Sequence, residues 1–239
     1  KGVISIGKKV AVEDKKMERL YLYDFSKKLG SYLGKSTSIF SISECAWYEN
    51  SDGLLCEGRE EKGVRPIFSV SLKGDIKEIY SITRDAKDLV GLQVLGEHNN
   101  KLIYHLKTVS KFEIFTYDLG NGKAEKIFSK EMFLAPFESY TSGKLFIDSL
   151  DGKTLHEIDI DSREVKEIYR TDRPFIFLPN DDGSSVYIFI PITDNDYNSP
   201  VDIYLVKDGS ARKIGEFKEK MTPADVTVAG EIVFMENFL

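Results

Sequence analysis

An all-β fold made of repeated four-stranded antiparallel sheets is predicted for this chain by three features of its sequence. A short strand-like phrase, such as F-E-I-F-T-Y-D-L at Phe112–Leu119, recurs along the chain. The residues that end its strand are spaced by 47, 47, 41 and 48 residues; they are Asp24, Ser71, Asp118, Asp159 and Lys207. Turn-forming glycine and aspartate residues separate the strands, and no amphipathic helix is evident. A period of this length, built from strands, predicts a β-propeller.

The same period defines the expected domain organisation. The chain has 239 residues, 41% of them hydrophobic, and can bury a substantial core. A single repeat cannot cover both faces of its own sheet, so the repeats must stack. We therefore expect one propeller domain over residues 1–239, with five full repeats at about 2–38, 39–83, 84–132, 133–171 and 172–222 and a partial sixth at 223–239.

Within each repeat the strands differ in character according to their expected position. Second strands such as Val186–Ile190 are almost continuously apolar, as expected for strands that are covered on both faces. Outer strands such as Glu125–Phe128 mix charged and apolar residues, which discourages pairing between sheet edges. The expected strands of the first repeat are Val3–Ile6, Lys9–Asp14, Arg19–Phe25 and Gly30–Lys35. Those of the second repeat are Ile39–Tyr48, Leu54–Gly58, Pro66–Leu72 and Ile76–Ile82, and those of the third are Leu89–Leu95, Leu102–Leu106, Phe112–Leu119 and Glu125–Phe128. Those of the fourth are Phe137–Tyr140, Lys144–Asp148, Leu155–Ile160 and Val165–Tyr169, and those of the fifth are Phe175–Leu178, Val186–Ile190, Ile203–Val206 and Arg212–Phe217.

The last repeat contains only two predicted strands, Ala224–Val228 and Glu231–Glu236. A propeller usually closes by completing one blade from both ends of the chain, but the first repeat already contains four predicted strands. Either the ring closes in a way that this assignment misses, or the chain is a piece of a longer protein. Because Glu231–Glu236 is too apolar for a free edge, we expect it to be covered by Val3–Asp14 or by another copy of the chain.

Composition argues against several classes of partner. A net charge of −6 and a pI near 5.3 disfavour binding to nucleic acid or to anionic membranes. No apolar run approaches the ~20 residues that a membrane span requires. Gln93 is the only glutamine, whereas lysine and glutamate are abundant, and this bias predicts a thermophilic, cytoplasmic source.

The two cysteines, Cys45 and Cys56, lie on consecutive predicted strands that are joined by Asn50–Gly53. This placement is compatible with a cross-strand bridge. We nevertheless predict buried free thiols, because cysteine packs well as a small apolar residue.

Two paired phrases carry a resemblance to a known family. Leu20–Lys28 and Ile114–Ile127 both read as a strand, an aspartate, a turn and a short charged strand, and Ala229–Leu239 is similar to a last propeller blade. In these residues the chain resembles TolB-like propellers and the propeller domain of acylaminoacyl peptidases of the prolyl oligopeptidase family. The resemblance implies a non-catalytic domain that caps an α/β-hydrolase domain and limits substrates to small peptides. The G-x-S-x-G nucleophile elbow of such hydrolases does not occur in this sequence.

The candidate binding residues are few. Glu138 follows Pro136-Phe137 on a predicted inner strand, and Tyr140, Phe175 and Tyr197 lie near loops where exposed aromatic rings would line a peptide-binding face. For most aromatic residues in strands, core packing is the competing interpretation. We expect no catalytic residue, no metal and no cofactor in this chain.

One enzymatic alternative and two kinds of metal site compete with this interpretation. A five-bladed glycosidase would place carboxylates on inner strands around a central funnel, and the candidates are Glu44, Asp88, Glu138 and Asp225. The histidines, His98, His105 and His156, lack the spacing of metal ligands, and the acidic stretches Asp181-Asp182 and Asp194-Asn195-Asp196 lack that of a calcium loop.

The function that the sequence favours is therefore a substrate-gating and docking domain of an acylaminoacyl-peptidase-like serine hydrolase. Its expected partners are a peptide substrate or a hydrolase domain, and a second copy of the chain through residues 224–236. The alternative from another class is a stand-alone propeller that binds a protein or a small ligand.

Overall fold

The computed structural model describes residues 10–12, 15–17, 20–24, 29–33, 40–50, 52–58, 63–83, 89–131, 138–149, 151–193, 200–218, 221–226 and 231–236. These residues form strands and turns only. Within them, no helical segment has the length and apolar character needed to span a bilayer. The chain divides into two compact units, Lys1–Phe133 and Leu134–Leu239, which are described in turn.

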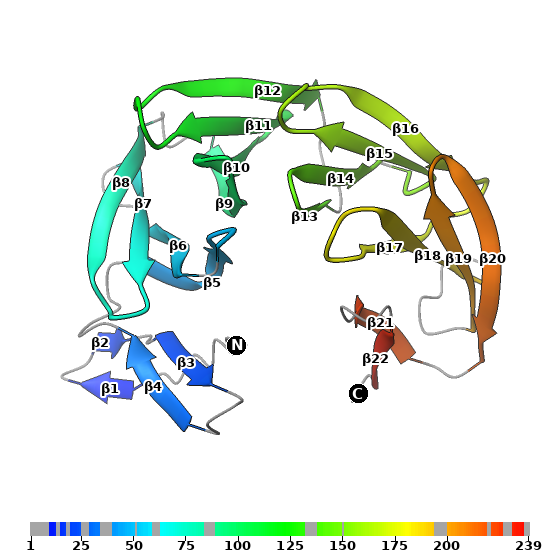
Figure 1. Ribbon diagram of the computed structural model, residues 1–239, viewed down its shortest axis with the longest axis horizontal. Coiled ribbons are helices and arrows are strands. Elements are labelled where there is room, and N and C mark those ends of the chain that lie inside the picture. Colours follow the sequence, from blue (N-terminus) through cyan, green and yellow to red (C-terminus); the bar gives the residue numbers. More distant parts are fainter. Residues whose placement is uncertain are drawn as a thin grey trace. The chain divides into compact units, whose positions relative to one another are not determined.

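The first unit contains two four-stranded antiparallel sheets (Figure 1). Each sheet follows the chain order from one strand to the next. The first consists of β5 (Phe40–Trp47), β6 (Gly53–Gly58), β7 (Val64–Ser71) and β8 (Ile76–Thr83). The second consists of β9 (Leu89–His98), β10 (Lys101–Thr108), β11 (Lys111–Asp118) and β12 (Ala124–Glu131). Two short pairs precede them: β1 (Val10–Val12) with β2 (Lys15–Met17), and β3 (Leu20–Asp24) with β4 (Leu29–Leu33).

The second unit repeats this organisation. One sheet consists of β13 (Glu138–Thr141), β14 (Lys144–Asp148), β15 (Thr154–Asp159) and β16 (Val165–Arg170). The next consists of β17 (Ile176–Pro179), β18 (Ser185–Pro191), β19 (Val201–Lys207) and β20 (Ser210–Phe217). A final pair, β21 (Met221–Val226) and β22 (Ile232–Glu236), follows them.

The predicted repeat is confirmed in the four complete sheets. Their third strands end at Ser71, Asp118, Asp159 and Lys207, and β3 ends at Asp24, the residue that the repeat places in the same position. The predicted four strands of the first repeat are not seen as one sheet, because its described residues form the separate pairs β1–β2 and β3–β4. Alternating apolar residues predict a strand but do not specify its partner, and this limits what the sequence says about that repeat.

Burial follows the predicted roles of the strands. Every residue of β6 is buried, and in β10 the five residues from Leu102 to Leu106 are buried. The outer strands β12, β16 and β20 are mostly exposed, as their mixed charged sequences predict. Side chains from neighbouring sheets meet in each unit: Leu55 and Ile67 pack with Leu102 and Tyr104 in the first unit, and Phe146 packs with Phe177 and Val186 in the second. Each sheet thus covers the apolar face of the next, which a single blade could not do alone.

The prediction of free thiols is wrong, because Cys45 and Cys56 form a disulfide. The two residues are direct partners in the register of β5 and β6, and their Cα atoms are 4.1 Å apart. The pairing follows an irregularity in the register between Phe40 and Cys45, which the sequence does not reveal. Cys56 is fully buried.

Candidate functional site

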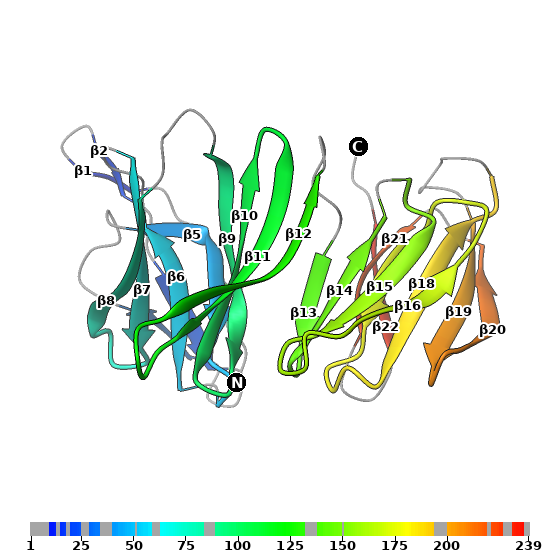
Figure 2. The same ribbon diagram turned by 90° about the horizontal axis from the view of Figure 1, so that it is seen from above.

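Two hairpin turns lie at one end of every four-stranded sheet, and we call this end the turn edge. In a sheet that follows chain order, the turn after the first strand and the turn after the third strand lie at the same end, because alternate strands run in opposite directions. Figure 2 shows this end in the second unit, where the hairpins after β15 and β17 lie at the same end of their sheets. The turn edge therefore gathers polar turn residues from two neighbouring sheets in each unit.

The aspartates that end the third strands cap the turns that follow them. Asp118 Oδ1 accepts hydrogen bonds from the backbone N–H groups of Gly120 (2.8 Å) and Asn121 (3.0 Å). Asp159 Oδ1 accepts from the N–H of Ser162 (2.7 Å) in the same way. The N–H groups of Asn121 and Gly120 lower the pKa of Asp118, and the N–H of Ser162 lowers that of Asp159. These carboxylates are structural elements of the turns, which explains why the third strands of two of the four complete sheets end on aspartate.

Left-handed residues close several of these hairpins. Asn99 and Asn100 have φ of 49° and 61°, and Asp208 and Gly209 have φ of 50° and 74°. Positive φ at both central positions defines the type I′ turn, in which asparagine, aspartate and glycine are favoured. The Asn99-Asn100 and Asp208-Gly209 hairpins are therefore of this type.

A reciprocal set of contacts joins the two four-stranded sheets of the first unit at the turn edge. Glu97 Oε2 accepts a hydrogen bond from the N–H of Glu49 (3.2 Å), and Glu97 Oε1 accepts from the N–H of Asn100 (2.7 Å). In return, Glu49 Oε1 lies 3.2 Å from His98 Nδ1. Each sheet thus supplies a carboxylate to the turn of the other.

An equivalent contact joins the sheets of the second unit. The hydroxyl groups of Thr141 (2.5 Å) and Ser142 (2.8 Å) both donate to the backbone carbonyl of Asp181. Thr141 and Ser142 belong to the β13–β14 hairpin, and Asp181 belongs to the β17–β18 hairpin. The first turns of neighbouring sheets are therefore fastened to each other in both units, although by different side chains.

A polar pocket of about 380 Å³ lies on the turn edge of the first unit, and we call it the acidic pocket. Among the residues that the structure describes, its charged lining consists of Asp52 and Glu97. Burial raises the pKa of the Tyr48 phenol, and the negative charges of Glu97 and Asp52 raise it further. The lining residues are Tyr48, Asn50, Asp52, Gly53, Ser69, Ser71, Glu97, Asn100 and Leu119. Both oxygens of Glu97 already accept backbone hydrogen bonds, so its carboxylate mainly holds the turns in place.

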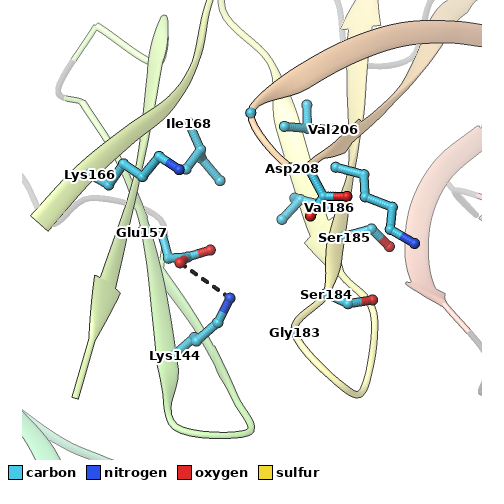
Figure 3. A pocket seen from close by; sticks show the side chains of 12 residues that line it. Lys144, Glu157, Lys166, Ile168, Gly183, Ser184, Ser185, Val186, Val206 and Asp208 are labelled. Carbon is cyan, nitrogen blue, oxygen red and sulfur yellow. Dashed lines mark ion pairs between the residues drawn. The ribbon is translucent and has the colours of Figure 1, made fainter. Parts of the chain in front are cut away.

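A second pocket, of about 120 Å³, lies on the turn edge of the second unit, and we call it the lysine pocket (Figure 3). Lys144, Lys166 and Lys207 line it, and they come from three different strands. Lys144 Nζ forms an ion pair with Glu157 Oε1 at 3.2 Å. The other lining residues are Ile168, Gly183, Ser184, Ser185, Val186, Val206, Asp208 and Gly209.

The predicted binding residues that the structure describes have different surroundings. Glu138 and Tyr140 both lie half-buried on β13, and the Tyr140 hydroxyl accepts a hydrogen bond from the N–H of Gly143 (3.3 Å). Phe175 is only 3% exposed and packs against Tyr169 and Phe177, so it belongs to the core of the second unit. Tyr197 lies outside the described residues.

The described residues that the glycosidase alternative names lie on the first strands of separate sheets. Glu44 lies on β5, Glu138 on β13 and Asp225 on β21, whereas Asp88 lies outside the described residues. Among the described residues, no three histidine, cysteine, aspartate or glutamate side chains gather as a metal site would require.

Those of the remaining candidates that the structure describes contact neighbouring residues of the fold. His98 contacts Glu49, and His105 is buried against Phe112 with ring centroids 5.0 Å apart. Asp181 and Asp182 lie in the β17–β18 hairpin, where Asp182 Oδ1 accepts from the N–H of Ser184 (2.8 Å). The stretch Asp194-Asn195-Asp196 lies outside the described residues.

Sequence reasoning missed the lysine pocket. Lys144, Lys166 and Lys207 are separated by whole strands, and each belongs to an ordinary charged stretch. Only the pairing of β14, β15 and β16 and the facing sheet bring them to one cavity. Aligning the hairpins of the repeats would have given a signal. Lys144 follows the first turn of its sheet and Lys207 precedes the third turn of the next sheet, and these turns lie at the same end of their sheets.

Comparisons with known proteins identify the fold. No protein-family model and no curated protein matches the chain. Among solved structures, an oligogalacturonate lyase in complex with manganese matches 89% of this chain at 14% identity and a TM-score of 0.63. A putative TolB from Agrobacterium tumefaciens matches 93% of it at 12% identity and a TM-score of 0.60. An acylaminoacyl peptidase from Pyrococcus horikoshii matches 87% of it at 15% identity and a TM-score of 0.60.

The lengths of these matches differ. The chain spans 62% of the lyase chain, 22% of the tricorn protease chain and 36% of the acylaminoacyl peptidase chain, but 85% of the putative TolB chain. At such low identities the likeness shows the fold alone. Together with the blade-like sheets, it identifies the chain as a β-propeller that resembles the TolB-like and acylaminoacyl peptidase propellers.

Proposed function

We propose that this chain is a non-catalytic propeller that docks and gates peptide substrates for a serine hydrolase of the acylaminoacyl peptidase type. The observation that carries the proposal is the fold likeness to two hydrolases. The chain matches 87% of its length to the acylaminoacyl peptidase and to a puromycin hydrolase, and it spans only 36% and 37% of those chains. A propeller that forms about a third of a hydrolase leaves the larger part of the molecule for the chemistry.

The use of the ionisable groups in the described residues supports a docking role over a catalytic one. Lowered carboxyl pKa values mark functional sites when they occur in a cleft beside a nucleophile or a base. Here the lowered values belong to Asp118, Asp151, Asp159 and Asp182, whose oxygens accept hydrogen bonds within their own turns, and to Glu167, which pairs with Arg170. These groups stabilise the turns and the outer strand β16. The turn edge is then a rigid surface that a partner can bind.

A second candidate function is a stand-alone propeller that binds a protein or a small ligand. The putative TolB favours it, because the chain spans 85% of that protein. The two candidates differ in what the gene encodes after Leu239. A reading frame that continues for about 250 residues into a G-x-S-x-G segment supports the hydrolase, and a stop codon near Leu239 supports the stand-alone propeller.

A cytoplasmic, thermophilic setting remains part of the proposal. The disulfide between Cys45 and Cys56 does not conflict with it, because intracellular proteins of hyperthermophiles are an exception to the rarity of cytosolic disulfides.

The proposal is tested by incubating the chain with a fluorophosphonate probe for active serines and measuring its intact mass. We expect an unchanged mass and no hydrolysis of acyl-peptide or ester substrates. Labelling of one serine per chain, abolished by prior denaturation, would contradict the non-catalytic assignment.

A further inference from the structure

Two of the short strand pairs each have half the strands of a complete sheet. Among the described strands, β3 pairs only with β4, and β22 pairs only with β21 (Figure 1). One edge of β3 and one edge of β22 therefore carry backbone N–H and C=O groups with no described partner strand. An edge of this kind is a template for pairing with a further strand.

The pair β21–β22 holds the places of a first and a second strand. β21 contacts β17, as β17 contacts β13 and β9 contacts β5, and each of these four-stranded sheets begins with the strand named here. Ile232 on β22 packs with Phe189 and Ile203 of the preceding sheet. Val186, near the start of the second strand β18, packs in the same way with Phe146 of the sheet before it. The pair therefore lacks a third and a fourth strand.

The pair β3–β4 has the register of a third and a fourth strand. β3 ends at Asp24, and the residue before it, Tyr23, pairs with Gly30, seven positions later. The same spacing follows the aspartates that end the third strands β11 and β15, where the pairs are Tyr117 with Ala124 and Ile158 with Val165. β1 and β2 form a sheet of their own and do not supply the first half of this blade. β3–β4 is thus the half that β21–β22 lacks.

One position of the outer strands differs in the sheet that precedes β21–β22. It is the residue that pairs with the third strand four positions before the end of that strand. Tyrosine or phenylalanine stands there in the first three complete sheets and glycine in the last; the residues are Tyr80, Phe128, Tyr169 and Gly215. A Cβ atom at Gly215 would meet nothing within 4 Å. The last complete sheet therefore leaves open the space that an aromatic ring takes in the others.

The aromatic rings at this position contact the third strand of the next sheet. Tyr80 stacks on Tyr117 with ring centroids 4.1 Å apart, and Tyr169 contacts Tyr204 with centroids 6.5 Å apart. Tyr117 is one residue before the end of its strand, and Tyr204 is three residues before the end of its strand. β3 has tyrosine at both positions, Tyr23 and Tyr21. A third strand with two tyrosines suits a preceding sheet that has glycine in place of its own aromatic residue.

We propose that β3 pairs with the free edge of β22 and completes a fifth four-stranded sheet in the order β21-β22-β3-β4. In the four complete sheets, the first apolar residue of the second strand pairs with the residue before the end of the third; the pairs are Leu54 with Val70, Leu102 with Tyr117, Leu145 with Ile158 and Val186 with Val206. The same register places Ile232 opposite Tyr23 and Val233 opposite Leu22.

The strand that we assign to this edge is the chain's own β3 and not that of a second copy. A segment of the same chain is present at an effective concentration on the order of millimolar. A second copy reaches such a concentration only in a very concentrated solution. The pairing does not depend on the docking function proposed above.

Hydrogen exchange of the unmodified chain, followed by NMR at single backbone amides, tests whether the edge of β22 is paired. In an antiparallel strand with a partner on one side, only alternate amides are hydrogen-bonded in the ladder, whereas a partner on each side protects consecutive amides. We expect consecutive slow amides over Ile232–Met235, as in β10, which has a partner on each side. An alternating pattern, as expected for β12 with β11 alone, would overturn the proposal.

A cysteine pair tests the identity and the register of the partner strand. L22C/V233C places cysteines at positions that the proposed register sets opposite each other, and L22C/E236C places them three residues out of register, too far apart for a disulfide. We expect L22C/V233C to form a disulfide within one chain at least about tenfold faster than L22C/E236C, as measured by mass spectrometry of non-reduced peptides and by gel migration as a monomer. Equal rates for the two variants, or a cross-linked dimer, would contradict the pairing of β22 with the chain's own β3.

Discussion

Single aspartates shape the turns of this protein, and their effect should be visible in its response to acid. Asp118 and Asp159 each accept backbone N–H groups, which hold their carboxyl pKa below the ordinary value. Their charged forms therefore favour the folded state. This contribution is complete above the pKa of an unfolded aspartate, ~3.9, and is lost as the pH falls through the lower pKa of the folded state.

The double variant D118N/D159N tests this. Asparagine keeps an Oδ1 acceptor for the same N–H groups but does not titrate. We expect the unfolding free energy of the wild type to fall more steeply than that of the variant below about pH 4, as measured by urea unfolding between pH 6 and 2. Parallel curves would show that the two carboxylates do not stabilise the turns by their charge.

The disulfide is the other residue-scale feature with a measurable effect. Cys45 and Cys56 are 11 residues apart, and closing a loop of this length stabilises a fold by about 2–3 kcal/mol in the chain-entropy model. C45A/C56A should lose about this much stability in denaturant unfolding. When the wild type is unfolded without a reducing agent, a thiol assay should detect no free cysteine. Two reactive thiols, together with unchanged stability of the variant, would contradict the bridge.

At the scale of the strand, the tight packing of β6 predicts contrasting effects of two glycine substitutions. A Cβ atom at Gly58 would lie 2.5 Å from Pro66 Cγ and 2.6 Å from Phe68 Cε2, whereas a Cβ at Gly215 on β20 meets nothing within 4 Å. We expect G58A to cost about 1–3 kcal/mol by overpacking. G215A should be neutral or stabilise by ~0.4–1 kcal/mol, because it restricts the unfolded chain. Urea midpoints measure both, and equal midpoints for the two variants would argue against the packing of β6.

The last strand pair supplies a second test at this scale. β22 pairs with β21 on one side, and no other described strand pairs with it. Ile232 packs against the buried cluster of Phe189, Val201 and Ile203. The sequence predicts that either the N-terminal segment Val3–Asp14 or a second copy of the chain covers this edge. The described part of the N-terminal segment, Val10–Val12, pairs with Lys15–Met17.

Deleting residues 221–239 would remove this pair and uncover the cluster. The ladder bonds between β21 and β22 leave with the deleted strands, so the cost to the remaining chain comes from exposing this apolar cluster to water. We expect a lower melting temperature or the dissociation of an oligomer, measured by differential scanning fluorimetry and by light scattering after size exclusion. A truncated chain that stays equally stable, with an unchanged mass in solution, would show that β21–β22 contributes nothing.

The sequence predicted the strands better than their partners. Lys144–Asp148 was predicted with its observed bounds, because an apolar run between two turns has few alternatives. The first repeat was predicted as one sheet and is seen as two pairs, since alternation alone does not encode pairing. The disulfide and the lysine pocket were missed for the same reason: both depend on which residues of separate strands lie opposite each other.

At the scale of the whole molecule, the fold is that of a β-propeller. The likeness to solved propellers extends over 87–93% of the chain for the acylaminoacyl peptidase and the putative TolB, while identity stays at 15% or below. Fold at this distance does not transfer a chemical activity. The docking function that we propose therefore rests on the turn edge, where hairpins of neighbouring sheets are fastened together and form a polar surface in each unit.

The central claim is binding without turnover, and one measurement addresses it directly. The chain is incubated with N-acetylated dipeptides that end in alanine, binding is followed by isothermal titration calorimetry, and the recovered peptide is examined by mass spectrometry. We expect saturable binding and intact peptide after prolonged incubation. Cleaved peptide, or the absence of any saturable binding at millimolar concentrations, would contradict the account.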